Sequence, residues 1–234
     1  MQWLNNTLPT LATATAKRRL LALCLLFALP LLVSAHPADE ALANMPRGEI
    51  AALYFQLGFK HILPLGLDHI LFVVCLYLLN PKLKTILWQA TAFTVAHSIT
   101  LGLAMYGVLS PTGSIVEPII ALSIFFVAAE NLITDELKPT RILLVFVFGL
   151  IHGLGFAGVL SDLGLPKGEF ATALILFNVG VELGQIVVIL GFWLVIGLWF
   201  SKKSWYRKRI VMPLSAVIAL IALYWTIERI FFTS

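Results

Sequence analysis

The sequence predicts an all-α, polytopic membrane protein in which six transmembrane helices follow an N-terminal signal sequence. Its composition supports this fold class: of the 234 residues, 60% are hydrophobic and only 12% are charged. The mean hydropathy of +0.96 is also higher than that of an ordinary soluble domain. Because about 20 apolar residues span a bilayer, the long apolar runs leave little of the chain for a separate soluble domain.

Residues 1–35 have the features of an export signal. Basic residues at positions 17–19 precede an apolar run from Leu20 to Leu32. The small-residue motif Val33-Ser34-Ala35 follows this run and is a candidate cleavage site of the A-x-A type. Cleavage there makes His36 the mature N-terminus. The alternative is an uncleaved signal anchor, because a long leader precedes the basic residues.

The mature chain divides into an N-terminal segment, 36–65, and a transmembrane domain, 66–234. The residues from Glu49 to Phe59 have an amphipathic pattern, which predicts a helix lying at the outer membrane interface. The transmembrane helices are expected at about 66–80, 85–107, 115–134, 141–160, 170–199 and 210–231. The first of these is short, so we expect it to extend back through the helix with His61, with Pro64 as a kink or break.

The distribution of basic residues predicts the orientation of the helices. Loops alternate between the two sides, and nine Lys and Arg residues fall on one side against four on the other. The nine are Lys82, Lys84, Lys138, Arg141, Lys202, Lys203, Arg207, Lys208 and Arg209, and the four are Arg47, Lys60, Lys167 and Arg229, on the side where Asp68 and His69 lie. The positive-inside rule places these nine in the cytoplasm and the mature N-terminus in the periplasm of a bacterial inner membrane. Topology therefore explains the net charge of +4 without a nucleic-acid partner.

Ionisable side chains also lie within the predicted helices, where each costs at least ~2.5 to 3.5 kcal/mol on insertion scales. Such residues need a partner or a water-filled cavity, and each is a candidate for a functional site. They are Asp68, His69, His97, Glu117, Glu130, His152 and Glu182, with the polar residues Ser98, Asn131, Asn178 and Gln185 beside them. Asn178, Glu182 and Gln185 follow one another at i, i+4 and i+7, which predicts one polar stripe on a helix.

Histidine and carboxylate side chains together predict a metal or proton site. All five histidines fall in or beside the outer and middle membrane layers, and the two cysteines lie inside apolar runs. Without thiolates, imidazole and carboxylate suit nickel, cobalt, zinc or copper(II). The predicted metal ligands are His36, His61, Asp68, His69, His97, His152, Asn178 and Glu182.

Some of these side chains also have a structural interpretation. A single histidine in a membrane helix is often a hydrogen-bonded packing residue, so the prediction depends on the whole set. Glu117 lies close to the outer interface and can reach water. Glu130 lies near the cytoplasmic end of its helix and can pair with Lys138 or Arg141.

Four segments of the chain match one known pattern in the right order. They are GLDHILF at 66–72, FTVAHSITL at 93–101, FGLIHGLGF at 148–156 and FNVGVELGQ at 177–185. With these motifs the chain resembles the HupE/UreJ family of bacterial membrane proteins, from about His36 to the fifth span. The resemblance implies nickel or cobalt uptake across the inner membrane, in association with hydrogenases and ureases.

Two departures indicate which branch of the family the chain resembles. Hydrogenase-type members have five residues between a histidine and an Asp-His pair, whereas six separate His61 from Asp68. Phe148 and Gly155 occupy a His and a Glu position of their second motif. The chain therefore resembles the second, broader branch, to which nickel is an extrapolation.

The first hypothesis is a permease or facilitator for a nickel- or cobalt-type divalent cation. His36 and His61 would capture the ion, Asp68 and His69 would form an outer site, and the deeper ligands a central site. The expected partners are the lipid bilayer, the metal ion, and either a second copy of the chain or a metalloenzyme under assembly.

Two alternatives remain open. One is an intramembrane zinc-dependent hydrolase, in which three histidines and Asp68 hold zinc. Glu182 or Glu130 would then act as general base, assisted by Ser98. The other is an accessory protein for metalloenzyme assembly.

Overall fold

The structure, a computed structural model, describes residues 45–110, 112–163 and 168–232. The signal sequence, its cleavage site and His36 lie outside these residues, so what the sequence predicts for them stays a prediction. The regular structure of the described residues is helical throughout, which confirms the all-α fold class.

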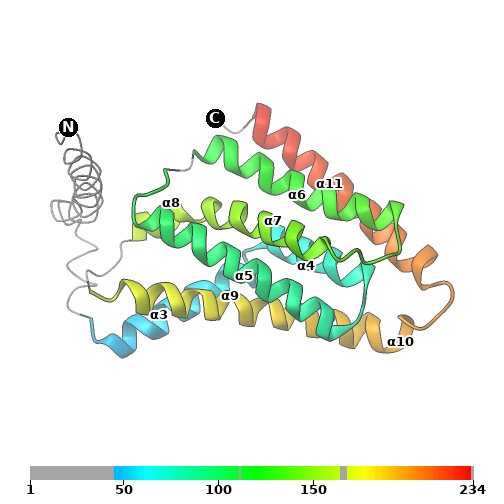
Figure 1. Cartoon of the computed structure of the whole chain (residues 1–234), viewed down its shortest axis with the longest axis horizontal. Coiled ribbons are helices and arrows are strands. Elements are labelled where there is room, and N and C mark those ends of the chain that lie inside the picture. Colours follow the sequence, from blue (N-terminus) through cyan, green and yellow to red (C-terminus); the bar gives the residue numbers. More distant parts are fainter. Residues whose placement is uncertain (1–44, 111, 164–167, 233–234) are drawn as a thin grey trace, which may run out of the picture. The chain divides into compact units, whose positions relative to one another are not determined.

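The helices follow one another in the order shown in Figure 1. They are α3 (Arg47–Ile62), α4 (Leu67–Leu79), α5 (Leu83–Met105), α6 (Gly113–Ile133), α7 (Arg141–Gly155), α8 (Ala157–Leu163), α9 (Phe170–Phe192), the π-helical turn η2 (Trp193–Gly197), α10 (Leu198–Phe200), the π-helical turn η3 (Arg207–Val211) and α11 (Met212–Phe231). Each of the six predicted transmembrane segments coincides with a helix or a continuous run of helices.

Length and composition divide these helices into candidate spans and shorter ones. Four runs are long and apolar enough to cross a membrane, namely Leu83–Met105, Gly113–Ile133, Phe170–Phe200 and Arg207–Phe231. Helices α3 and α4 make a fifth candidate if the bent pair counts as one span. Helix α7 has 15 residues, about 22 Å at 1.5 Å per residue, which is short of the hydrocarbon core of about 30 Å. The described residues thus hold four to five candidate spans, and six spans stay a prediction.

The predicted break at Pro64 is present. Helix α3 ends at Ile62, α4 begins at Leu67, and the two helices are bent by 64°. Proline lacks the backbone N–H that a continuous helix needs. Gly66 fits directly against the end of α3, because a Cβ atom there would lie 2.1 Å from the carbonyl oxygen of His61. This tight turn keeps the end of α3 close to the start of α4.

Helix α3 packs lengthwise against α9, and small residues make the close approach possible. A Cβ atom on Gly58 would lie 1.9 Å from the carbonyl oxygen of Phe177, and one on Gly180 would lie 2.2 Å from that of Phe55. The helix is longer than the predicted segment 49–59 and packs within the bundle (Figure 1). Its place at the membrane interface stays a prediction.

An exposed ion pair joins the start of α3 to the residue that precedes α9. The Nε atom of Arg47 lies 2.8 Å from an Oε atom of Glu169, and the Arg47 side chain is 74% exposed. The pKa of the Glu169 carboxyl is lowered, mainly by a hydrogen bond with Thr172 and also by Arg47. Exposed pairs of this kind contribute little to stability.

A buried ion pair joins the end of α6 to the start of α7. The Nη1 atom of Arg141 lies 2.6 Å from Glu130, and the Arg141 side chain is only 1% exposed. This is one of the two partners predicted for Glu130. Beside it, Asn131 donates hydrogen bonds to the carbonyl of Cys75 in α4 and to the hydroxyl of Ser215 in α11. Polar groups therefore connect α6 to three other helices.

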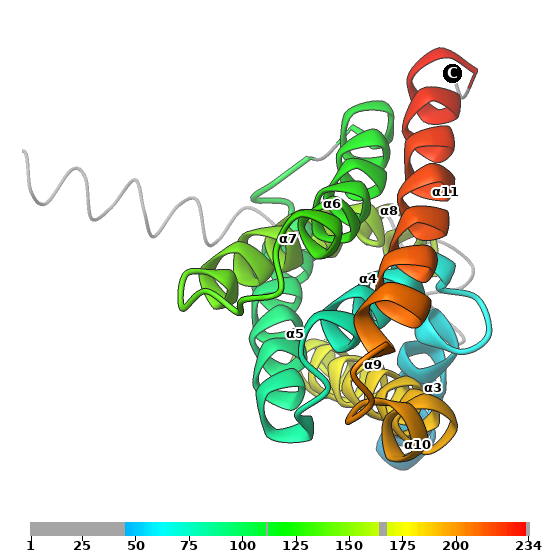
Figure 2. The ribbon, with the colours of Figure 1, turned by 90° about the vertical axis from the view of Figure 1, so that its right-hand side faces the viewer.

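Helix α4 is the central helix of the bundle. Every residue from Phe72 to Leu79 is buried, as expected for a helix that is apolar on all sides. Figure 2 shows α11 beside α6, and α5 beside α7, around α4. Because Asp68 and His69 belong to the first turn of α4, this arrangement places them at one end of the core.

Candidate metal centre

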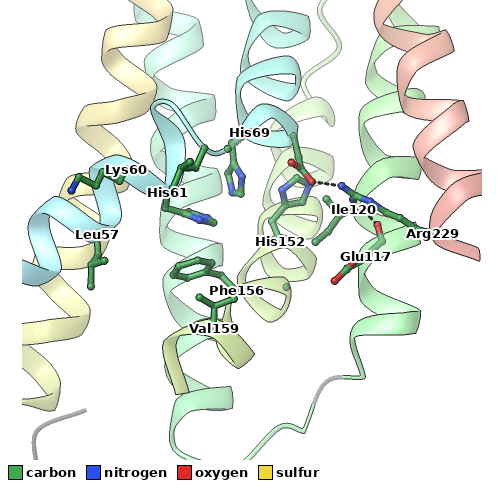
Figure 3. A pocket seen from close by; sticks show the side chains of 14 residues that line it. Leu57, Lys60, His61, His69, Glu117, Ile120, His152, Phe156, Val159 and Arg229 are labelled. Atoms are coloured by element: carbon green, nitrogen blue, oxygen red, sulfur yellow. Dashed lines mark hydrogen bonds and ion pairs between the residues drawn. The ribbon is translucent and has the colours of Figure 1, made fainter. Parts of the chain in front are cut away.

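Four histidines from four different helices meet at the start of α4. His61 comes from the last turn of α3, His69 from the first turn of α4, His97 from α5 and His152 from α7. The ring centroids of His61 and His69 are 4.6 Å apart, and those of His69 and His152 are 5.0 Å apart. The His97 ring is 5.8 Å from both His61 and His69. Figure 3 shows three of them, His61, His69 and His152, gathered at one pocket. We call these four residues the histidine cluster.

A glycine brings α7 close enough to α5 for the cluster to form. A Cβ atom on Gly153 would lie 2.3 Å from the carbonyl oxygen of His97 and 2.3 Å from the hydroxyl oxygen of Thr100. Thr100 also donates a hydrogen bond of 2.6 Å to the carbonyl of Leu150 in α7. This contact places His152 beside the face of α5 that carries His97.

Asn178 of α9 determines the tautomer of His97. Its Nδ2 group donates a hydrogen bond of 2.8 Å to the carbonyl of Leu174, so its Oδ1 atom faces Nδ1 of His97, at 3.3 Å. An amide oxygen only accepts hydrogen bonds, which assigns the hydrogen to Nδ1 and leaves a free lone pair on Nε2. That Nε2 atom is buried and has no hydrogen-bond partner in the described part of the chain.

Ser123 of α6 has the same effect on His152, through the opposite nitrogen. The Ser123 hydroxyl donates its one hydrogen to the carbonyl of Ile120, at 2.7 Å. Its oxygen is therefore an acceptor for Nε2 of His152, which lies 3.0 Å away. The free lone pair of His152 is on Nδ1, and this atom too is buried without a partner among the described residues.

The other two histidines, His61 and His69, also have a buried ring nitrogen without a hydrogen-bond partner in residues 45–110, 112–163 and 168–232. In both of them this atom is Nε2. A buried polar atom without a partner costs about 1–3 kcal/mol. Four imidazole nitrogens of this kind in one cluster fit a cation that accepts lone pairs, and nitrogen donors suit nickel, cobalt, zinc or copper(II).

Three of the donors already lie near one another. One nitrogen from each of His61, His69 and His97 can be chosen so that all three lie within 4.8 Å. In a tetrahedral zinc site, with Zn–N bonds of about 2.0–2.1 Å, the nitrogens are about 3.3 Å apart. The three side chains must therefore move closer to one another to bind the same ion.

A pocket of about 470 Å³ opens beside the cluster. Its wall contains His61, His69 and His152, and its charged residues are Lys60, Asp68, Glu117 and Arg229 (Figure 3). Lys60 and Glu117 are exposed, so the pocket connects the histidines with the surface.

The predicted ligand Asp68 has a partner that the sequence did not suggest. Its Oδ2 atom lies 2.9 Å from Nη2 of Arg229 in α11, and Nη1 of the same guanidinium donates to the carbonyl of Glu117 at 3.1 Å. Arg229 and Ser123 are the site residues that sequence reasoning missed. The only sequence signal for Arg229 was its assignment to the same side of the membrane as Asp68.

Glu182, also a predicted ligand, lies one turn along α9 from Asn178. Its two carboxylate oxygens accept hydrogen bonds from Thr91 at 2.7 Å and Thr94 at 2.5 Å. Thr94 also lies 3.4 Å from Oε1 of Gln185. The predicted polar stripe of α9 therefore faces α5, but only its first member, Asn178, contacts a histidine in the part of the chain that the structure describes.

The three residues expected to serve hydrolysis have other partners. The Ser98 hydroxyl donates to the carbonyl of Thr94 at 2.6 Å. Glu130 is paired with Arg141, and Glu182 accepts from two threonines. Among the described residues, none of these three side chains forms a hydrogen bond or ion pair with the histidine cluster.

One comparison with known proteins gives a match. A family model described as HupE / UreJ protein matches residues 38–229, a range that includes the whole histidine cluster. No curated protein and no solved structure matches the chain.

Proposed function

Because the chain belongs to the HupE / UreJ family, we propose that it is an inner-membrane permease or facilitator for a divalent transition metal of the nickel or cobalt type. The family is generally linked to nickel or cobalt transport or to metalloenzyme maturation. The observation that carries the proposal is the histidine cluster, with four buried imidazole nitrogens that lack a partner among the described residues.

The pocket supplies a route to the cluster. In the proposed topology, with six spans and a periplasmic mature N-terminus, Lys60 and Arg229 mark the periplasmic end, as the positive-inside rule suggests. The pocket beside them reaches His61, His69 and His152. An ion would enter from the periplasm, with capture by His36 at the mature N-terminus, and would leave toward the cytoplasm by alternating access or a gated path.

The pocket beside the donors supports a cargo site. A permease must release the ion that it binds, whereas a structural zinc site is closed and contributes directly to folding. The donors of His61, His69 and His97 lie within 4.8 Å of one another, and the pocket beside them reaches the surface. An ion bound there would have a path by which to leave.

The test is metal binding and metal uptake by the full chain. Equilibrium dialysis of the purified protein with nickel, cobalt, zinc or copper, read by elemental analysis, is expected to give about one exchangeable ion per chain. His61→Ala, His69→Ala, His97→Ala and His152→Ala should each weaken binding and reduce uptake into proteoliposomes. Tyr77→Phe is a suitable control, because this buried residue lies outside the cluster and the pocket.

Two results would overturn the proposal. One is a protein that binds none of these metals, with uptake unchanged by the His97 and His152 substitutions. The other is a zinc ion that survives purification and does not exchange with added metal, which would favour the intramembrane hydrolase.

A further inference from the structure

We propose that Arg229 competes with entering cations for the carboxylate of Asp68 and thereby decides which cations reach the histidine cluster. The inference rests on the proposed function and deepens it, because it assigns cation selectivity to one residue of the pocket. Arg229 lies 160 positions from His69 in the sequence, and only the fold brings its guanidinium group to the carboxylate beside that histidine.

Asp68 lines the same pocket as three histidines of the cluster and is paired with Arg229. Asp68 directly precedes His69 in the first turn of α4. Its carboxylate lies 2.9 Å from the guanidinium, and the two side chains are only 27% and 20% exposed. Arg229 also donates to the carbonyl of Glu117 and stacks on Trp225, with its Cζ atom 5.5 Å from the ring centroid. The guanidinium is thus held in the pocket wall by three contacts.

The position of Arg229 changes the charge that a cation entering the pocket encounters. A free carboxylate beside the histidines would attract any cation, including sodium and magnesium, because oxygen ligands suit hard ions. With Arg229 paired to Asp68 that attraction is neutralised. In Figure 3, Arg229 extends toward the side of the pocket where His152 lies.

Only some cations can take the place of Arg229. A nickel- or cobalt-type ion that enters the pocket past Asp68 gains imidazole nitrogens from the histidines that line the same pocket, and this gain offsets the loss of the ion pair. Sodium has one charge and magnesium prefers oxygen ligands and retains its water, so neither obtains the same gain. Arg229 is long and partly exposed, so it can swing into water when a transition-metal ion arrives.

Four chains and one control test the inference. They are the wild type, Arg229→Gln, Asp68→Asn, the double variant Asp68→Asn/Arg229→Gln, and the control Lys60→Gln. Lys60 lines the same pocket and carries the same charge, but no ion pair within 4.0 Å holds it among the described residues. Nickel affinity is measured on the full chain in detergent by isothermal titration calorimetry, with and without added magnesium chloride or sodium chloride.

We expect Arg229→Gln to tighten nickel binding by about fivefold to tenfold, the scale of a partly exposed ion pair. The same variant should become more sensitive to magnesium and sodium, a change that a merely structural role for Arg229 would not produce. In the Asp68→Asn background, Arg229→Gln should have a much smaller effect, as a double-mutant cycle reveals. Lys60→Gln should change nickel affinity by less than about twofold.

Three outcomes would overturn the inference: equal effects of Arg229→Gln and Lys60→Gln, an undiminished Arg229 effect in the Asp68→Asn background, or magnesium sensitivity like that of the wild type. If Arg229→Gln does not fold, Arg229→Lys takes its place. This variant keeps the charge but loses the fork that reaches Asp68 and Glu117 together, and it should show a smaller change in the same direction. If the wild type binds no transition metal, the proposed function itself is refuted. If the wild type binds nickel through the histidines but one of the three outcomes above is found, only the inference about Arg229 is refuted.

Discussion

The Oδ1 atom of Asn178 lies 3.3 Å from the Nδ1 atom of His97, so a residue of α9 decides which nitrogen of a histidine in α5 is free. The hydrogen bond from Asn178 Nδ2 to the carbonyl of Leu174 fixes the amide in that orientation. Partners of this kind hold a metal-binding imidazole in one tautomer and one orientation. Asn178 is therefore a positioning residue for His97.

Removal of this partner should weaken metal binding. Asn178→Ala is expected to lower nickel affinity by about 10- to 100-fold, the usual effect of losing a hydrogen-bond partner behind a ligand. Asn178→Asp keeps an acceptor at Nδ1 and should bind at least as tightly as the wild type. Asn131→Ala is the control, because it removes another buried amide, one whose partners are Cys75 and Ser215. It should lower thermal stability but leave nickel affinity unchanged. Equal affinities in Asn178→Ala and Asn178→Asp would contradict the tautomer assignment.

Glu130→Gln should destabilise the fold strongly. The substitution leaves the buried Arg141 guanidinium without its carboxylate, and breaking a buried pair costs about 3–5 kcal/mol. The melting temperature in detergent measures the effect. Glu169→Gln removes an exposed ion pair instead and should leave the melting temperature nearly unchanged.

The same variant addresses the hydrolase alternative. If Glu130 only pairs with Arg141, Glu130→Gln/Arg141→Met should recover much of the lost stability, since apolar replacements of buried pairs are often neutral. Nickel affinity per folded protein should be unaffected. A selective loss of a zinc-dependent activity in a well-folded Glu130→Gln variant would instead support a catalytic role.

Gly58→Ala should separate α3 from α9. Its Cβ atom would overlap the backbone of Phe177, which cannot rotate away as a side chain can. Overpacking of this kind costs about 1–3 kcal/mol. Gly48→Ala, in the same helix, has nothing within 4 Å of the added atom and should be neutral or slightly stabilising, because alanine favours a helix over glycine. Equal melting temperatures of the two variants would mean that α3 does not pack on α9 as described.

Metal affinity should fall as the pH is lowered. A metal ion and a proton compete for the same imidazole lone pair, so binding releases protons and weakens when protons are abundant. Titrations from about pH 8 down to about pH 4, a range that extends well below the ordinary histidine pKa, should show a loss of affinity toward the acid end. The His97→Ala variant should show a smaller loss, because one competing imidazole is absent. Binding in which the wild type and His97→Ala change equally with pH would contradict His97 as a ligand.

The sequence was sufficient to predict the helices, and it placed the four histidines among the candidate ligands, but in separate capture, outer and central sites and not in one cluster. Apolar runs predict their own helices because the chain must satisfy its backbone hydrogen bonds where water is absent. Pro64 marked the break between two helices. Ionisable residues in an apolar run require partners, and this requirement brought His61, His69, His97 and His152 into one predicted set.

The relationships between distant residues were not predictable from the sequence. The pairing of Asp68 with Arg229 depends on how α11 packs against α4 and α6. Ser123 is one hydroxyl in an apolar helix, and its role follows only from its distance to His152. The amphipathic pattern of α3 predicted an apolar contact but did not identify α9 as a partner.

The 64° bend between α3 and α4 has a mechanical consequence. His61 lies in the last turn of α3 and His69 in the first turn of α4. The angle between the two helices therefore affects the distance between these two proposed ligands. An ion bound by both histidines would hold the two helices at this angle, and a straightening of the chain at Pro64 would move the two histidines apart. Release of a bound ion would then be coupled to a change in the angle between α3 and α4.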